Sequence, residues 1–177
     1  MKTIYFIRHA KAANFEVGES DFERSLSKKG IKDIKTIGSY LKLRSTQADI
    51  ILSSCAIRAQ DTALKLSSIL SYQGNIEYFE HLYKSSIEEI IEIIQMQENE
   101  SQRMIIIGHH PYLTELVNQL SPEHISKIPS MGVVCMQFDT NNWNDITTVK
   151  GNIDFFIFPK QFKYYMPKQI RTSMDGV

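Results

Sequence analysis

The run Thr3-Ile4-Tyr5-Phe6-Ile7-Arg8-His9 decides the interpretation of this chain. Its first five residues are β-branched or aromatic, which is typical of a buried strand. The run then stops at a guanidinium and an imidazole. Ligands of a parallel α/β sheet bind at the carboxyl ends of its strands. Arg8 would therefore offer a cation to an anionic ligand there, and His9 a nucleophile or base.

Two further apolar runs end in the same way. Met104–Gly108 leads into His109-His110-Pro111, and Ile50–Leu52 leads through Ser53-Ser54 to Arg58. Three predicted strands thus each deliver a cation or an imidazole just past their ends, which is hard to obtain by chance. We expect these side chains to gather at one edge of one sheet.

Strand-like runs alternate with helical patterns, which favours βαβ units. Four apolar stripes at helical spacing are expected to be core faces, the first capped by Ser27 and the last beginning near Pro111. Their positions are 31–41, 59–70, 87–94 and 113–120, and further strand candidates are 76–79, 133–138 and 154–158. We expect a single domain over residues 1–177. It should be an α/β fold, a three-layer α/β/α sandwich whose central sheet is mostly parallel with an antiparallel edge strand.

The composition excludes several classes of protein. The chain of 177 residues has 20 basic and 20 acidic residues, so we expect no bulk attraction to nucleic acid or to an anionic membrane. Met1–Ile7 is too short for a signal peptide and no run has spanning length, which favours a cytoplasmic protein. Cys55 and Cys135 lie far apart without metal-ligand spacing, so neither a disulfide framework nor a zinc site is expected.

The residues at the three strand ends resemble the motifs of the histidine phosphatase superfamily, which is also called phosphoglycerate-mutase-like. They are Arg8-His9-Ala10, where the family has R-H-G, then Ser54 with Arg58-Ala59 and Thr62, and Gly108-His109. The compact length, the segment Asp21-x-x-Arg24-x-Leu26-Ser27-x-x-Gly30 and the Gly-His-x-Pro run are similar to the SixA branch of phosphohistidine phosphatases. The resemblance extends from Met1 to about Leu120.

The chemistry of these residues fits phosphoryl transfer. Arg8 and Arg58 can each bind phosphate oxygens in a forked geometry, and His109 can donate to one of them. His9 is the expected nucleophile, forming a phosphohistidine enzyme that water then hydrolyses. Attack requires a neutral ring. The charges of the two arginines disfavour the imidazolium and should therefore lower the pKa of His9. A backbone carbonyl should fix the tautomer of the ring. The resemblance implies the same four roles, and we expect no metal and no cofactor.

Three further residues are weaker candidates for substrate binding. Arg24 could reach the substrate or brace its loop. Ser54 belongs to the motif that resembles the family. Larger relatives carry a glutamate, as general acid, two residues after the leucine that corresponds to Leu82. Lys84 stands at that position here, and Glu80 is the only acid nearby.

These features predict a metal-independent phosphatase that acts on phosphohistidine in a protein. A phosphatase of small phosphorylated metabolites, such as sugar or nucleotide phosphates, is the alternative. A phosphate-binding module without catalysis is a third possibility. The family's mutases are longer, and no cysteine is followed by arginine six positions later, as a cysteine phosphatase requires.

The basic and aromatic stretch 160–171 is expected to pack on the body, with docking of an acidic partner or nucleic acid as the alternative.

Overall fold

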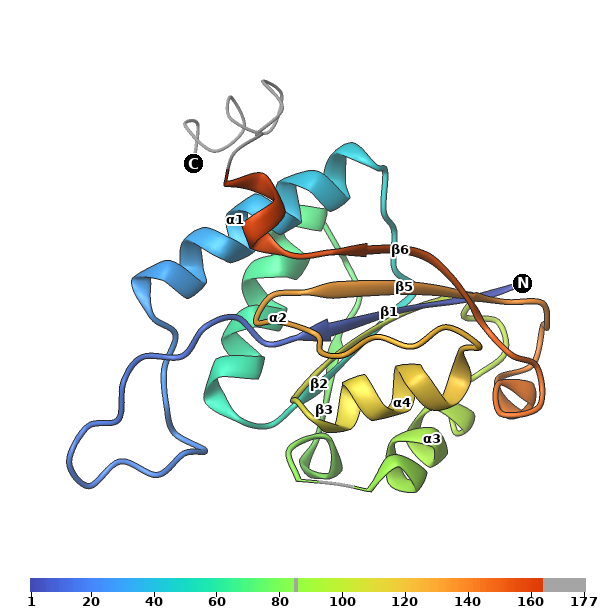
Figure 1. The fold of residues 1–177 in the computed structure, drawn as a ribbon, viewed down its shortest axis with the longest axis horizontal. Helices are drawn as coiled ribbons and strands as arrows, with labels where there is room; N and C mark the ends of the chain where they lie inside the picture. Colours follow the sequence, from blue (N-terminus) through green and yellow to red (C-terminus); the bar gives the residue numbers. More distant parts are fainter. Residues whose placement is uncertain (85, 164–177) are drawn as a thin grey trace.

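A computed structural model describes residues 1–84 and 86–163 of the chain. Its centre is one six-stranded sheet with the strand order β3-β2-β4-β1-β5-β6 (Figure 1). The strands, in chain order, are β1 (Lys2–Arg8), β2 (Ile50–Ser54), β3 (Ile76–Phe79), β4 (Arg103–Gly108), β5 (Val133–Phe138) and β6 (Asn152–Ile157). Each of the six lies where a β-branched or aromatic run predicted it.

The sheet has a parallel part and an antiparallel part. β3, β2, β4 and β1 are parallel neighbours, whereas β5 runs antiparallel to β1 and β6 runs antiparallel to β5. The predicted α/β sheet with an antiparallel edge is confirmed. The strand whose direction is reversed is β5, one place in from the edge, and β6 forms the edge itself.

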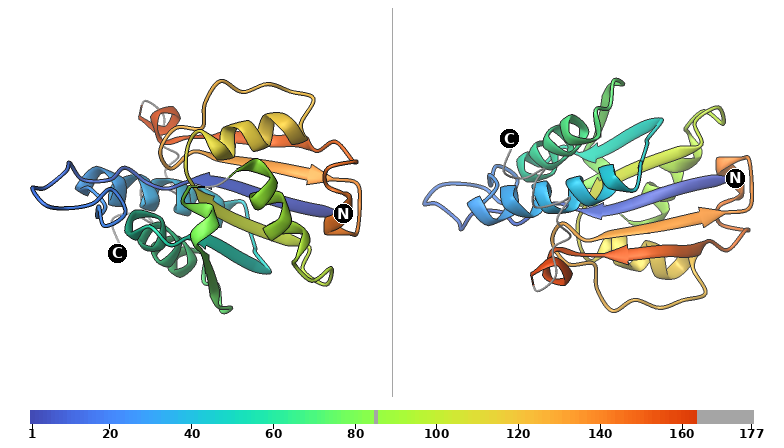
Figure 2. Two further views of the ribbon diagram at one scale, coloured as in Figure 1. Left: turned by 90° about the horizontal axis from the view of Figure 1, so that it is seen from below. Right: turned by 90° about the horizontal axis from the view of Figure 1, so that it is seen from above.

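Helices cover both faces of the sheet and complete the three layers (Figure 2). α1 (Lys28–Leu43) and α2 (Ile57–Leu70) bury their apolar stripes against one face. α3 (Ile87–Gln95) and α4 (Tyr112–Leu120) bury theirs against the other. All four stripes are core faces as predicted, although Ile31 at the start of the first stripe is 36% exposed.

The start of α1 anchors the loop that follows β1. The Ser27 hydroxyl caps the helix by accepting from the Gly30 amide at 3.0 Å, as predicted. The same hydroxyl and the Ser27 amide donate to the carbonyl oxygen of Lys11, each at 2.9 Å. A Cβ at Gly30 would collide with that carbonyl, so the close approach requires glycine. The backbone of Lys11 is therefore held in place beside the strand ends.

Within the described part of the chain, no helix is long and apolar enough to cross a bilayer. The stretch 160–171 is described only as far as Lys163. Phe162 is buried and packs edge-on against Tyr40, with ring centroids 5.2 Å apart, as expected for the start of a tail that folds onto the body. The rest of that prediction lies outside the described residues.

Candidate active site

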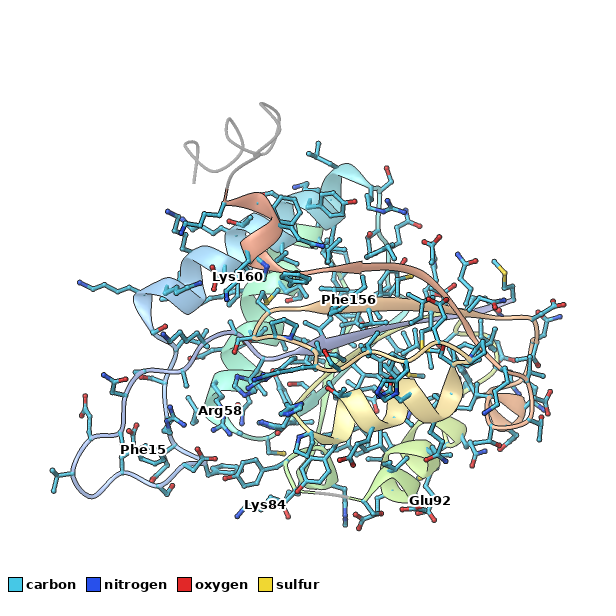
Figure 3. All side chains as sticks on the ribbon, in the orientation of Figure 1. Phe15, Arg58, Lys84, Glu92, Phe156 and Lys160 are labelled. Atoms are coloured by element: carbon cyan, nitrogen blue, oxygen red, sulfur yellow. The ribbon has the colours of Figure 1, made fainter. Side chains whose placement is uncertain are left out.

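The carboxyl ends of three neighbouring parallel strands meet at one cavity of about 440 Å³. His9 follows β1 directly, His109 follows β4 directly, and Arg58 lies in the first turn of α2 after β2. The four predicted catalytic residues, Arg8, His9, Arg58 and His109, all line this cavity. Figure 3 shows Arg58 on this side of the molecule, between the labelled Phe15 and Lys84.

His9 is held in a single tautomer. Its Nδ1 lies 2.7 Å from the carbonyl oxygen of Ala10, and its Nε2 lies 3.2 Å from Nε of Arg58. A carbonyl can only accept and a guanidinium can only donate, so the ring proton is on Nδ1 and the lone pair is on Nε2. The prediction that a backbone carbonyl fixes the tautomer is confirmed.

The pKa of His9 is lowered to about 4, so the ring is neutral near pH 7. Burial is the largest cause, because desolvation penalises the imidazolium. The hydrogen bond to Ala10 opposes the shift, while the charges of Arg58 and Arg8 add to it. The predicted direction is confirmed. The predicted cause was the two arginines, but burial contributes more than either.

Arg58 connects the nucleophile to the loop after β1. Its guanidinium is buried and donates to the backbone carbonyl of Asp21 through Nη1 and to the Asp21 carboxylate through Nη2, the latter at 2.9 Å. The same carboxylate accepts from Arg24 at 3.0 Å and from the Tyr83 hydroxyl at 2.9 Å. Burial favours a higher pKa for Asp21, but these hydrogen bonds and the Arg58 charge outweigh it and lower the pKa to about 2. Asp21 is thus ionised and holds Arg58 in place.

His109 is also neutral. Its pKa is lowered to about 3, first by burial and then by the nearby His9 and Arg58. Nε2 lies 2.8 Å from the Ser54 hydroxyl, and Nδ1 lies 3.4 Å from Nη2 of Arg58 on the cavity side. Because a guanidinium can only donate, Nδ1 carries the lone pair here and the ring proton is on Nε2, which donates to Ser54. When a ligand oxygen takes the place of the Arg58 contact, the Ser54 hydroxyl can donate to Nε2 instead, and the ring proton on Nδ1 is then available to that oxygen.

The remaining predicted residues have different positions. Arg8 lines the cavity and donates to the Ile128 carbonyl at 3.1 Å. Arg24 also lines it, but its guanidinium is engaged with Asp21 and the Ala13 carbonyl, so it braces the loop.

Two predicted substrate-binding residues do not line the cavity. Ser54 is fully buried beneath His109, with which it shares a hydrogen bond. Glu80 is exposed in the short 3₁₀ turn after β3 and is not among the described residues that line the cavity. Lys84, which stands where larger relatives carry the acid, does line the cavity.

Sequence reasoning gave no role to several lining residues, among them Asp21 and Tyr83. Asp21 was visible as part of the Asp-x-x-Arg segment, but nothing local indicated that it would bind Arg58. Tyr83 packs edge-on against His109, with centroids 5.3 Å apart, and no sequence pattern marks it. Residues 1–84 and 86–163 contain no group of three or more acidic, histidine or cysteine side chains placed to hold a metal ion.

A pH titration followed by NMR tests the state of His9. An ordinary imidazole is about nine-tenths protonated at pH 5.5, whereas a pKa of about 4 leaves the His9 ring almost entirely neutral there. We therefore expect the His9 ring signals, assigned by their loss in His9→Ala, to move only below about pH 5. A titration midpoint near 6.5 would contradict the buried, neutral ring.

The chain is similar to proteins of known family. A family model described as histidine phosphatase superfamily, branch 1, matches residues 4–89. An uncharacterised protein of Mycobacterium tuberculosis is 28% identical over 153 residues, which cover 79% of this chain and 91% of the relative. The family match spans the Arg-His pair, Ser54 and Arg58.

Three solved structures share the fold. The protein histidine phosphatase SixA, complexed with tungstate, superposes with a TM-score of 0.79 at 21% identity over 91% of this chain and 99% of its own. A protein from Agrobacterium tumefaciens, provisionally named phosphohistidine phosphatase SixA, gives 0.77 at 25% identity over 88% and 97%. A mycobacterial glucosyl-3-phosphoglycerate phosphatase complexed with VO₃ gives 0.67 at 14% identity over 88% and 98%.

The family match and the shared phosphoglycerate-mutase-like fold agree with the arrangement of the cavity, in which one neutral histidine lies between half-buried Arg8 and buried Arg58 and faces a second histidine. The chain matches the histidine phosphatase superfamily over residues 4–89 and shares its fold with SixA, and these likenesses support a phosphatase of the hydrolase class.

Proposed function

We propose that this phosphatase removes the phosphoryl group from phosphohistidine in a protein, through a covalent intermediate on His9. The observation that carries the proposal is the lone pair on His9 Nε2, fixed by the hydrogen bond from Nδ1 to Ala10 and directed toward the guanidinium of Arg58. A nucleophile in this setting is aimed at an anion that the arginine would bind.

The first half of the reaction transfers the phosphoryl group to the enzyme. Arg8 and Arg58 bind its oxygens, and Nε of Arg58 exchanges its hydrogen bond to His9 for one to the phosphoryl group. The freed lone pair of Nε2 forms the bond to phosphorus as the bond to the leaving imidazole breaks. Nδ1 keeps its proton, which it donates to the Ala10 carbonyl, so the ring of the phosphohistidine that forms carries one positive charge. The leaving imidazole takes the electron pair of the broken bond and departs as a neutral ring when its other nitrogen carries a proton.

The second half returns the enzyme to its starting state. Water attacks phosphorus, the bond to Nε2 breaks, and its electron pair returns to the ring. The proton of the water leaves on inorganic phosphate or passes to solvent. Once a phosphoryl oxygen replaces Arg58 beside Nδ1 of His109, the Ser54 hydroxyl donates to Nε2 and the ring proton is on Nδ1. His109 then donates to that oxygen and stabilises the charge that develops in both steps.

The supply of acid in the cavity favours phosphohistidine over an alkyl phosphate. Asp21 is the only carboxyl group among the described residues that line the cavity. Its pKa of about 2 and its three donors keep it ionised, so it has no proton to give a departing alkoxide. An imidazole leaves without that help far more easily. The fold shared with SixA supports the same substrate.

A small phosphorylated metabolite is the second candidate substrate. The observation in its favour is the fold likeness, at a TM-score of 0.67, to a phosphatase named for glucosyl-3-phosphoglycerate. The absence of a protonated carboxyl group from the described lining weighs against it.

Rapid acid quench and base quench with a phosphohistidine peptide test the proposal, with a chelator present throughout. We expect a phosphoenzyme that is labile in acid, stable in base and mapped to His9 by peptide sequencing. Because arginines supply the positive charge that a metal would otherwise provide, the chelator should change turnover by less than about twofold. Loss of the intermediate on chelation, restored by a divalent ion, would refute metal independence. Turnover of the peptide without a trapped intermediate would refute covalent catalysis.

A further inference from the structure

The cavity carries more positive charge than one phosphoryl group neutralises. Five cationic side chains line it against one carboxylate, Asp21, while His9 and His109 are neutral. Four positive charges therefore remain, and a phosphate dianion would balance two of them. The five cations are Arg8, Lys11, Arg24, Arg58 and Lys84.

The surplus belongs to the two lysines. Arg58 and Arg24 are paired with Asp21, and Arg8 lies beside the nucleophile where the phosphoryl group binds. Among the residues that the structure describes, neither Lys11 nor Lys84 has a carboxylate within ion-pair distance. Both line the cavity and are exposed to solvent, which puts these two residues on its outer side.

Each lysine is placed by a rigid neighbour. The backbone of Lys11 is fixed by Ser27 and by the close approach of Gly30. Nζ of Lys84 lies 5.4 Å from the centroid of the Tyr83 ring, and that ring packs edge-on against His109. The two cations therefore come from separate loops to the outer part of one cavity, beyond the groups that hold the phosphoryl oxygens.

We propose that Lys11 and Lys84 form a second anion subsite, which binds a carboxylate or second phosphate on the leaving-group side of the substrate. The proposal rests on phosphoryl transfer at His9 and holds for either candidate substrate. In a phosphoprotein the anion would be an aspartate or glutamate beside the phosphohistidine. In a metabolite it would be a second acidic group.

A matched pair of aryl phosphates, one with a carboxylate on the ring and one without, tests the subsite without phosphohistidine. An exposed ion pair is weak, so we expect the wild type to prefer the carboxylated compound in kcat/KM by roughly tenfold, with about threefold from each lysine. Lys11→Met and Lys84→Met should each lower that ratio about threefold, and the double variant should bring it close to one. Lys65→Met, which changes an exposed lysine on α2 away from the cavity, is the matched control and should keep the full ratio.

Measurements of salt dependence and of direct binding test the anion subsite separately from the proposed phosphohistidine substrate. The preference should shrink as ionic strength rises from about 0.05 M to about 0.5 M, because exposed charges are screened. Calorimetry on His9→Ala should give the same ratio of affinities without turnover. Phosphohistidine peptides with acidic or neutral flanks, and sugar monophosphates or bisphosphates, then identify the source of the anion. A ratio that stays the same in the double variant would overturn the subsite. Failure of phosphohistidine peptides alone would overturn only the proposed substrate.

Discussion

Replacing His9 with alanine is expected to lower kcat/KM by on the order of 10⁴-fold or more, on any substrate that the enzyme turns over. The ring presents a lone pair on Nε2 next to Arg58, with its tautomer already fixed by Ala10. Without it the arginines and His109 can still bind phosphate, but no group of theirs can form the covalent bond. Steady-state kinetics with an activated aryl phosphate measure the loss.

The control is binding of inorganic phosphate, since the oxygens are held by groups that His9→Ala leaves in place. We expect phosphate affinity to change by only a few-fold and the circular dichroism spectrum to match that of the wild type. Imidazole added to His9→Ala should restore part of the rate, because the vacated volume adjoins the bound phosphoryl group. Near-normal turnover in His9→Ala would rule out His9 as the nucleophile.

The strands could be predicted because their signal is local. β3 and β5 begin and end where the predicted strands 76–79 and 133–138 do, because β-branched and aromatic residues are concentrated in both segments. The convergence of Arg8, Arg58 and His109 followed from the same signal. The carboxyl ends of parallel strands meet at one edge, so residues just past those ends come together whatever the strand order.

The contacts that prepare the site are not local, and the sequence does not reveal them. Asp21 binds Arg58 from a loop 37 positions away in the chain. Tyr83, which follows the edge strand β3, donates to the same carboxylate from 62 positions away. The pKa of His9 is governed first by burial, which depends on how the helices close over the strand ends. The charges of Arg58 and Arg8 could be predicted from the sequence, but each contributes less to the pKa shift of His9 than burial does.

The leaving group is where the second large effect is expected. We predict that phosphohistidine, or an activated aryl phosphate, is turned over roughly 10²–10⁴-fold faster than phosphoserine or a sugar phosphate. An alkoxide needs a proton as it departs, and the one carboxyl group in the described lining is ionised Asp21. Parallel kcat/KM measurements on these substrates, at one pH and ionic strength, give the ratio.

Glu80→Gln tests the only other acid that the sequence offers near this position. Glu80 is exposed and does not line the cavity, so the substitution should leave phosphohistidine turnover nearly unchanged. Efficient hydrolysis of an unactivated alkyl phosphate that Glu80→Gln abolishes would show that a loop movement brings Glu80 to the leaving group. The metabolite would then be the better substrate, because such an enzyme would have the proton donor that an alkoxide requires. If activity on alkyl phosphates is instead weak and unchanged in Glu80→Gln, the substrate selectivity comes from the chemistry of the departing group itself. An imidazole that departs without a protein acid is then the chemistry for which this cavity is suited.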